Sequence, residues 1–375
     1  MSRKKGKAQR RVKDWLGRFE AGGKAEDSAR APQRFSVRGV KLPPWRLLAP
    51  QENLEGLANA EGMVIGMFPG GAIVRSGGAD LLCGIAKTFR APEGATSLAV
   101  GDAVTVAVTR GQRLQAAGDD KVRADGMILA RHPRRTALSR PQPRSGKHRG
   151  EYEPDLAEKV IAANMDLLLI VTSTRQPVYR QNLVDRFMIV AERGELKPVL
   201  AINKIDLAPA DEQVVADCRA MGLEVFPCSA QTGGGLAELG ACLSDKAAVL
   251  AGASGAGKST LINALVPGAS AATGEVRMRD QRGRHTTTAA AVYDLPRGGI
   301  LVDTPGVREL GVRMAAADLP WYYPEFEEFA PRCRFNDCSH THEPNCAVIA
   351  AVEAGKVPPR RYESYLRVLE TLEKR

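Results

Sequence analysis

The chain has 375 residues, 44% of them hydrophobic, and its 53 Lys and Arg outnumber its 43 Asp and Glu, which gives a formal net charge of +10. This length predicts two or three domains, and the composition is ordinary for a water-soluble protein. No apolar run approaches the ~20 residues of a membrane span, and the first residues lack the apolar stretch of a signal peptide, so we expect a cytoplasmic protein with no membrane association.

Residues 1–57 form a basic arm in which we expect little order. Residues 1–50 carry 14 Lys and Arg against 4 Asp and Glu. Clustered positive charge favours contact with a polyanion, most simply nucleic acid, although a solvated tail without a partner would have the same composition. Trp15, Leu16 and Phe19 could form one short amphipathic turn that docks on a partner.

Residues 58–135 contain five short apolar or β-branched runs separated by Gly and Pro turns. The runs are 62–68, 72–75, 80–86, 102–108 and 126–130. Strands at this spacing predict a small antiparallel β-barrel, and the OB-fold is the commonest such barrel that binds RNA. A barrel that mediates only protein contact is the alternative.

A second basic stretch, 110–150, has 11 Lys and Arg against 3 Asp, and its end is rich in Pro. We expect residues 136–150 to be a linker. From 151 to 314 buried strands alternate with helices, which predicts an α/β domain. The apolar runs 166–171 and 198–202 are typical of parallel strands, and 182–194 between them has helical spacing.

The strongest motif is Gly252-Ala-Ser-Gly-Ala-Gly-Lys-Ser-Thr260, a phosphate-binding loop of the form G-x-x-x-x-G-K-[ST]. A short apolar strand, 246–251, precedes it and a helical pattern follows from 261. Glycines let backbone N–H groups turn toward an anion, and a helix N-terminus adds the positive end of its dipole. Lys258 can reach the β- and γ-phosphates, and the Ser259 hydroxyl can ligate Mg²⁺.

Two further motifs predict that the base is guanine. Asn203-Lys-Ile-Asp206 matches N-K-x-D, in which Asp206 accepts hydrogen bonds from guanine N1–H and the exocyclic amine. Adenine lacks that donor pair, and the buried polar groups it would leave unpaired exclude it. Ser229 and Ala230 resemble the short S-A element whose backbone N–H helps to hold guanine O6.

The switch segments follow the phosphate-binding loop. Gly283-Arg-His-Thr-Thr-Thr288 contains a threonine that would complete the Mg²⁺ shell; Thr286, Thr287 and Thr288 are all candidates, and we favour Thr287. Asp303-Thr-Pro-Gly306 is a D-x-x-G motif after an apolar strand. Asp303 can hold Mg²⁺ through water, and the Gly306 N–H can contact the γ-phosphate.

The position after this motif is Val307, where Ras-like enzymes have the Gln that orients the attacking water. Val307 cannot form that hydrogen bond, so we expect slow intrinsic hydrolysis and stimulation by a partner. His285 is a candidate to position the water, and contact with the partner is an equally good interpretation of it.

The motifs occur in rotated order, with N-K-x-D and S-A before the phosphate-binding loop, as in a circular permutation. The second switch therefore leads out of the domain, and something should anchor it. Cys333-x4-Cys338-x-His340-x5-Cys346 is the ligand set of a closed tetrahedral Zn²⁺ site, with His342 as a competing ligand. We expect a small domain over 315–375 with helices at 346–355 and 359–374, to which Arg360, Arg361, Arg367 and Lys374 give basic character.

Taken in this order, the five motifs resemble the ribosome small subunit-dependent GTPase A family, the RsgA-like circularly permuted GTPases, over about residues 58–375. The resemblance implies an OB-fold, a permuted P-loop GTPase domain and a small α-rich zinc-binding domain. It also implies Mg-dependent hydrolysis of GTP to GDP during late maturation of the small ribosomal subunit, with rRNA as a partner; we expect a monomer.

The expected site residues fall into three groups, catalytic, nucleotide-binding and metal-binding. The catalytic candidates are Lys258, His285, Thr287, Asp303 and Gly306. The nucleotide-binding candidates are Asn203, Lys204, Ile205, Asp206, Ser229, Ala230, Gly252, Ala253, Ser254, Gly255, Ala256, Gly257, Lys258, Ser259 and Thr260. The metal ligands are Cys333, Cys338, His340 and Cys346 for one Zn²⁺, and Ser259, Thr287 and Asp303 for Mg²⁺.

A function from another class fits the same motifs. The chain could be a GTP-gated RNA-binding or chaperone module whose hydrolysis is incidental. An ATPase is disfavoured by Asn203-Lys-Ile-Asp206. Turnover of GTP and ATP, with and without small subunits, separates these hypotheses.

Overall fold

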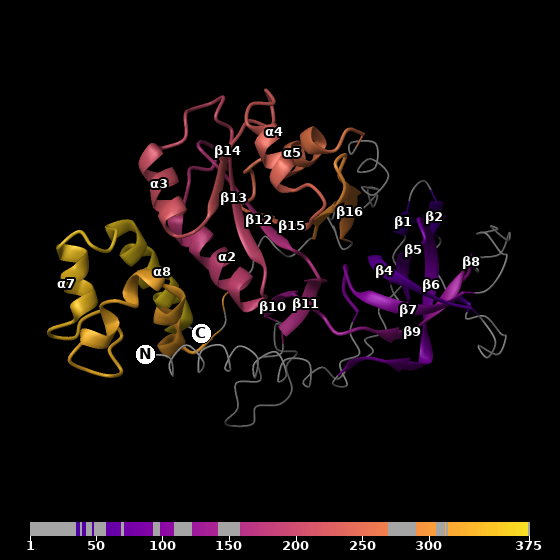
Figure 1. Cartoon of the computed structure of the whole chain (residues 1–375), viewed down its shortest axis with the longest axis horizontal. Helices are drawn as coiled ribbons and strands as arrows, with labels where there is room; N and C mark the ends of the chain where they lie inside the picture. Colours follow the sequence, from indigo (N-terminus) through magenta and orange to yellow (C-terminus); the bar gives the residue numbers. More distant parts are fainter. Residues whose placement is uncertain are drawn as a thin grey trace, which may run out of the picture.

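The computed structural model describes residues 35–37, 40–42, 47–48, 58–68, 71–92, 98–108, 122–141, 158–268, 290–304, 312 and 314–373. Figure 1 shows a β-barrel at one end of the molecule, a sheet covered by helices in the middle, and the C-terminal helices at the other end. Within the predicted arm, the strands β1 (Phe35–Val37) and β2 (Val40–Leu42) pair with each other, and β3 (Leu47–Leu48) pairs with β8 (Val122–Arg123). Trp15, Leu16 and Phe19 lie outside the described residues.

The five runs predicted over 58–135 form the closed barrel. Its strands are β4 (Ala58–Phe68), β5 (Gly71–Ser76), β6 (Ala79–Arg90), β7 (Ala103–Val108) and β9 (Gly126–Arg131), in the order β4-β5-β6-β9-β7. This is the strand order of an OB-fold, which confirms the prediction. The pair β6 and β9 is parallel, so the prediction of a wholly antiparallel barrel was wrong. The two strands can run in the same direction because β7, which runs in the opposite direction to β9, lies between them in the chain. Val64, Val74 and Ile128 fill the interior.

The middle of the molecule is a six-stranded, mostly parallel sheet whose strands alternate with helices along the chain, which confirms the α/β prediction. The strands are β12 (Leu167–Ser173), β13 (Lys197–Asn203), β14 (Glu224–Pro227), β15 (Ala247–Gly252), β16 (Ala291–Asp294) and β17 (Ile300–Asp303). Their order is β14-β13-β12-β15-β17-β16. All neighbours are parallel except β16, which pairs antiparallel with β17 at the edge.

Helices cover both faces of this sheet, which explains why its central strands carry apolar residues on both faces. The helices are α2 (Gln181–Arg193), α3 (Glu212–Ala220), α4 (Leu236–Cys242) and α5 (Lys258–Leu265). Alternate residues of a strand point to opposite faces. Leu168 and Ile170 pack in the cluster that includes α2 and α3, whereas Leu169 packs in the cluster that includes α4 and α5.

The barrel meets the sheet domain at a joint that has both apolar and polar contacts; Val100, which precedes β7, packs in the cluster that includes α2. Residues 137–141, expected in the linker, instead form β10 (Ala137–Pro141), which pairs with β11 (Glu158–Ala163). Beside this pair the guanidinium of Arg134 donates to both carboxylate oxygens of Asp102, at 2.7 and 2.9 Å, and neither side chain is more than 2% exposed. Asn164 extends the joint by donating to the Gly101 carbonyl oxygen at 2.9 Å.

The C-terminal residues form an α-rich domain, as predicted. It contains the 3₁₀ turns η3 (Ala316–Tyr322), η4 (Pro324–Phe326) and η5 (Ala330–Arg332) and the helices α7 (Ala347–Glu353) and α8 (Pro359–Glu373). Helix α8 packs against α2. Tyr323, Phe326 and Tyr365 share one buried cluster with Phe187 of α2, so the core of this domain is continuous with one face of the sheet domain.

Arg361 of α8, one of the residues expected to give this domain basic character, is buried at this second joint. Its side chain is 2% exposed and lies against Asp185 of α2. It donates to both carboxylate oxygens of Glu325, at 2.7 and 3.0 Å, and its guanidinium lies 4.4 Å from the centre of the Tyr323 ring. Two carboxylates compensate one buried cation here, which explains how the charge can leave water.

None of the helices in the described part of the chain combines the length and the apolar character that crossing a membrane requires.

Candidate nucleotide site and metal centre

The nucleotide motifs meet at one edge of the sheet because they follow parallel strands. Strand β13 ends at Asn203, β14 at Pro227, β15 at Gly252 and β17 at Asp303, so the loops that carry the motifs begin side by side. The carboxyl ends of parallel strands are the usual place for a ligand in such sheets.

The phosphate-binding loop runs from the end of β15 to the first turn of α5. Gly252 and Gly257 have φ of 137° and 89°, and close neighbours leave neither of them room for a side chain. A Cβ on Gly252 would lie 2.1 Å from the Val171 carbonyl oxygen, and one on Gly257 would lie 2.4 Å from Asn203 Nδ2. Glycine is therefore required at both positions, and the backbone is free to present its N–H groups to phosphate.

Lys258 and Ser259 begin helix α5. The Lys258 side chain is 7% exposed, and its Nζ donates to the carbonyl oxygens of Gly252 and Ala253 at 2.8 and 2.6 Å. The ammonium group is thus held over the concave side of its own loop. Ser259 and Thr260 are exposed, which leaves the Ser259 hydroxyl accessible to a hydrated Mg²⁺ ion.

Asn203 connects three of the predicted motifs. Its side chain is 2% exposed; its Nδ2 donates to the Ala256 carbonyl oxygen at 3.0 Å, and its Oδ1 accepts the Ala230 N–H at 3.0 Å. The N-K-x-D loop, the phosphate-binding loop and the S-A element are therefore fixed to one another by a single amide.

Lys204 and Asp206 complete the base-binding side. Lys204 has φ of 66°, and its Nζ donates to the Gly255 carbonyl oxygen at 2.7 Å, so its stem crosses the mouth of the loop. Asp206 is exposed, and one of its carboxylate oxygens accepts the Ser229 hydroxyl at 2.5 Å. That hydrogen bond orients Asp206 and leaves lone pairs on the carboxylate for guanine donors.

Thr174 and Gln176 support this loop and were missed in the sequence. The Thr174 hydroxyl donates to the Lys204 carbonyl oxygen at 2.7 Å, and the Gln176 carbonyl oxygen accepts from Lys204 Nζ. Both residues directly follow β12, at the same sheet edge as the motifs. That position after a buried parallel strand was the signal that could have identified them.

The γ-phosphate side is described only in part. Asp303 is half-buried at the end of β17, and the Thr304 side chain is 4% exposed with a hydroxyl that makes no hydrogen bond within the described residues. A buried hydroxyl of this kind at a phosphate-binding edge fits a polar ligand. The remaining switch predictions, His285, Thr286, Thr287, Thr288, Gly306 and Val307, lie outside the described residues.

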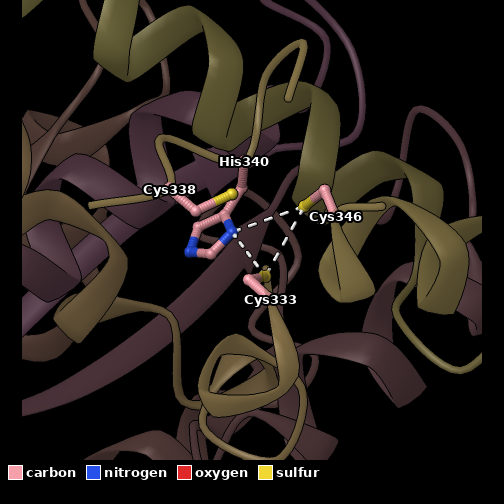
Figure 2. A group of neighbouring side chains, drawn as sticks. All are labelled: Cys333, Cys338, His340 and Cys346. Atoms are coloured by element: carbon pink, nitrogen blue, oxygen red, sulfur yellow. Dashed lines mark hydrogen bonds between the residues drawn. The ribbon is translucent and has the colours of Figure 1, made fainter. Parts of the chain in front are cut away.

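The predicted metal ligands converge in the C-terminal domain. Figure 2 shows Cys333, Cys338, His340 and Cys346 facing one another, and their ligand atoms all lie within 4.8 Å. The Sγ atoms of Cys333 and Cys346 are 3.9 Å apart, and His340 Nδ1 lies 3.6 and 3.5 Å from them. A tetrahedral Zn²⁺ with Zn–S near 2.3 Å and Zn–N near 2.0 Å has edges of roughly 3.8 and 3.6 Å, so the measured separations fit it.

The surroundings hold His340 in this place and exclude His342. His340 is 3% exposed, has φ of 58°, and its carbonyl oxygen accepts the Tyr362 hydroxyl at 2.8 Å. His342 is exposed, and its Nδ1 is hydrogen-bonded to Thr341 Oγ1 at 2.7 Å. Glu343 accepts backbone N–H groups of the same loop, including that of Ser339 at 2.6 Å, which fixes the shape of the loop.

The protonation of the cluster is consistent with a cation-binding role. Burial and then the thiols of Cys346 and Cys333 raise the pKa of Cys338 to about 12, and burial lowers the pKa of His340. Without a cation, therefore, the cluster holds a neutral thiol at Cys338 and a neutral imidazole. A divalent metal ion supplies the positive charge that allows such thiols to ionise, and the imidazole is already in its ligating form.

Comparison with known proteins gives one consistent family. The family model described as RsgA GTPase matches residues 131–313. The small ribosomal subunit biogenesis GTPase RsgA of Shewanella oneidensis is 38% identical over 297 residues, which are 78% of this chain and 77% of that protein. The protein of the same name from Chlorobaculum tepidum is 40% identical over 286 residues, 75% of this chain and 87% of that protein.

Two solved structures are similar over most of the chain. YjeQ from Thermotoga maritima has a TM-score of 0.61 and 28% sequence identity, covering 85% of this chain and 100% of that one. YloQ, described as a circularly permuted GTPase, has a TM-score of 0.59 and 24% identity, covering 86% and 98%. The second likeness is one of fold alone.

Proposed function

Because the chain belongs to the RsgA family of circularly permuted GTPases, we propose that it hydrolyses GTP and acts in late maturation of the small ribosomal subunit. The observation that carries the proposal is the position of Asn203, whose amide joins the phosphate-binding loop to both guanine motifs. The names of the relatives supply the ribosomal partner.

The residues at the sheet edge have distinct roles in this proposal. The backbone N–H groups of the loop Gly252–Gly257 hold the phosphates, and Lys258 leaves its loop carbonyls to reach the β- and γ-phosphates. Asp206, oriented by Ser229, accepts the two guanine donors. The stem of Lys204 lies along the base.

Ser259 and Asp303 would hold Mg²⁺, and Thr287 would complete the shell from the first switch. The ion supplies neutralisation of the charge that develops on the phosphates. Gly306 would contact the γ-phosphate. Since Val307 cannot orient water, the isolated protein hydrolyses GTP slowly, and ordering of the switches by the subunit accelerates the reaction, with His285 as the residue that positions water.

The Cys333, Cys338, His340 and Cys346 cluster would bind one Zn²⁺. The soft thiolate and imidazole donors and the tetrahedral separations support this metal. All four positions are taken by protein ligands, so the ion would stabilise the fold and would not take part in hydrolysis.

For the domains, we propose that the basic arm ends at 57 and the barrel at 135. In this proposal β10 and β11 join the barrel to a GTPase domain that extends to 314, and the metal domain covers 315–375. The barrel and the metal domain would contact rRNA from opposite ends of the molecule. We propose a cytoplasmic monomer that binds the small subunit as its partner.

Turnover of GTP and ATP with and without purified small subunits tests the proposal. We expect hydrolysis of GTP alone, slow in isolation and strongly stimulated by subunits. GTP-dependent RNA binding with no stimulated turnover would instead support the gated RNA-binding or chaperone module. Fast hydrolysis by the isolated protein would contradict the activation step.

Asp206→Asn tests the guanine assignment separately. The amide offers a donor in place of one acceptor, so we expect weaker GTP binding and a gain for xanthosine triphosphate, whose 2-oxo group accepts a hydrogen bond. Asp211→Asn, at an exposed carboxylate beyond the site, is the matched control. Unchanged GTP affinity in Asp206→Asn would remove the carboxylate from the site.

A further inference from the structure

A cavity of about 450 Å³ lies between the sheet domain and helix α8. Three segments and Ile202 of β13 line it; the segments are residues 174–182 after β12, residues 208–214 between the N-K-x-D loop and α3, and one face of α8 over 360–367. None of residues 203–206, 229–230 or 252–260 lines it, so it is separate from the nucleotide site. Its volume is within the usual range of ligand pockets.

The cavity adjoins the back of the guanine loop. Thr174 lies on its wall and donates two hydrogen bonds to that loop, from its N–H to the Asn203 carbonyl oxygen at 3.1 Å and from its hydroxyl to the Lys204 carbonyl oxygen at 2.7 Å. A ligand in the cavity would therefore contact a segment that also fixes the base-binding loop.

The charged groups of the cavity are mostly cationic. Four arginines and two carboxylates line it. Arg360 is 3.6 Å from Asp211 across the cavity, and Arg367 is 3.8 Å from Glu363 along α8. Arg175 and Arg180 form no ion pair with any residue that the structure describes, and both are exposed at the opening. Two guanidinium groups are thus available to an anion.

The lining also has an apolar part. Ile202 and Val214 are 2% and 6% exposed beneath it, and Val178 is 58% exposed at its edge. An apolar surface beside free arginines suits a planar base joined to a phosphate, because bases stack on apolar and guanidinium surfaces while phosphates pair with Arg. An acidic peptide would use the arginines but would leave the apolar part without a partner.

We propose that this cavity binds one nucleotide of a single RNA strand. The base packs against Val178 and the apolar lining, and the phosphate pairs with Arg175 and Arg180. The inference rests on the proposed function in one respect, that the strand belongs to the RNA of the small subunit. A free nucleoside monophosphate has the same base and phosphate, so the experiment must distinguish it from a nucleotide within an RNA strand.

The test uses the full chain saturated with GDP and a fluorescein-labelled uridine tetranucleotide, because uracil lacks the guanine pattern. The double variant Arg175→Gln, Arg180→Gln removes the two available cations. The matched control Lys246→Gln, Arg297→Gln removes equal charge at the amino ends of β15 and β17, the opposite edge of the sheet. We expect about tenfold weaker binding and a smaller salt dependence for the first variant only. Unchanged thermal unfolding and GDP affinity must accompany the result.

Three further arms locate the ligand. A tetramer containing 4-thiouridine should crosslink to peptides from 174–182, 208–214 or 360–367. An abasic tetramer should bind about tenfold more weakly than the uridine tetramer. UMP at the same concentration should compete poorly.

Equal losses in the double variant and its control would overturn the proposal, as would crosslinks confined to other segments. If the abasic tetramer binds as tightly as the uridine tetramer, the site contacts only phosphate. If a tetraglutamate probe binds more tightly than the uridine tetramer, the site suits an acidic protein. Either result overturns the proposal. If UMP competes as well as the tetramer, the ligand is a free nucleotide and the assignment to RNA is wrong.

GTP turnover with small subunits, measured on the same samples, separates this inference from the proposed function. If small subunits do not stimulate GTP turnover by the wild-type chain but the crosslinks at the cavity are found, the proposed function is contradicted and the inference stands. Normal stimulation without binding at the cavity would contradict only the inference.

Discussion

The two flanking domains are attached to the GTPase domain in different ways. The barrel has its own apolar interior, and its joint combines the buried Asp102–Arg134 pair and the Asn164 hydrogen bond with a small apolar contact, in which Val100 packs in the core of the sheet domain. The C-terminal domain shares a core with α2, and its joint is the buried contact of Arg361 with Asp185 and Glu325. The barrel therefore shares only a small apolar contact with the GTPase domain, whereas the C-terminal domain continues its core.

This difference has a mechanical meaning. The second switch leads from β17 into the C-terminal domain, so a domain that shares its core with α2 gives that segment a fixed end. The barrel lies beside the edge strand β16, which pairs with β17. Contact with a partner at the C-terminal end should therefore reach the GTPase core more strongly than contact at the barrel.

Loss of the proposed metal site should have the largest effect. Ligation of structural Zn²⁺ contributes on the order of 10 kcal/mol to folding in small zinc domains. We expect Cys346→Ser to lose bound metal, to unfold residues 315–373 and to lower the unfolding temperature of the GTPase domain through the shared core. Metal analysis, circular dichroism and limited proteolysis measure these effects.

Cys242→Ser, a half-buried cysteine outside the cluster, is the control and should keep its metal. The barrel should stay protease-resistant in both variants because its core is separate. A Cys346→Ser chain with full helical content and unchanged unfolding of the GTPase domain would show that the cluster is not needed for folding.

Arg361→Ala should have the next largest effect. It leaves two carboxylates, Asp185 and Glu325, without their buried cation, and removal of one partner of such a network costs about 3–5 kcal/mol. Burial already raises the pKa of Asp185, and the Arg361 charge opposes this shift, so loss of Arg361 should favour the protonated carboxyl. Denaturant unfolding measures the cost.

The neighbouring Arg360→Ala is the matched control. Arg360 is half-exposed and 3.6 Å from Asp211, so its loss should cost less than ~1 kcal/mol. Equal destabilisation by the two variants would mean that the burial of Arg361 has no energetic consequence.

Arg134→Ala should have a smaller effect, confined to the barrel. It leaves one carboxylate, and Asp102 keeps the hydrogen bond from the Ala99 N–H at 2.7 Å, so we expect about 3 kcal/mol. Hydrogen exchange should speed up in the barrel and its joint while α2 and α5 keep their protection. Equal loss of protection in α2 would show that the barrel is not a separate unit.

The sequence predicted the sites better than it predicted the joints. The strand expected at 246–251 and the helix expected from 261 are β15 and α5, although α5 begins earlier, at Lys258. These elements and the cluster of Cys333, Cys338 and His340 follow from local patterns, in which neighbouring residues carry the signal. Arg361 has no such signal, because its partners Asp185 and Glu325 come from other elements, and a basic residue in an amphipathic helix indicates a surface.

Thr174 and Gln176 were missed for a related reason. They belong to no motif, and their hydrogen bonds to Lys204 exist only because parallel strands bring the loops after β12 and β13 together. The β10 strand, which was expected to be a linker, also depends on a partner that follows later in the chain. Contacts between distant segments decide these features, and a single sequence does not record them.

The smallest effect should come from Arg75→Ala, which tests whether the barrel has a second attachment. Arg75 of β5 pairs with Asp80 of β6 at 2.9 Å and with Asp294 of β16, which is 59% exposed. The Asp294 pair is exposed, and such pairs contribute about 0–1 kcal/mol and weaken with salt, so its part of the loss should stay below ~1 kcal/mol and disappear at high ionic strength. The Arg75 and Asp80 side chains are only 22% and 14% exposed, so the part of the loss that belongs to their pair should resist salt. The Asp80 pair lies within the barrel, whereas the Asp294 pair crosses to the GTPase domain. Asp294→Asn therefore removes only the crossing contact and should have no more effect on stability than Arg75→Ala.

Subunit-stimulated GTP turnover should stay within about twofold in both variants, because β16 keeps its register with β17 through backbone hydrogen bonds. A salt-resistant loss as large as that of Arg361→Ala, or a turnover that falls with Asp294→Asn alone, would mean that the barrel is coupled to the switches through β16 and that its joint is not the weaker of the two.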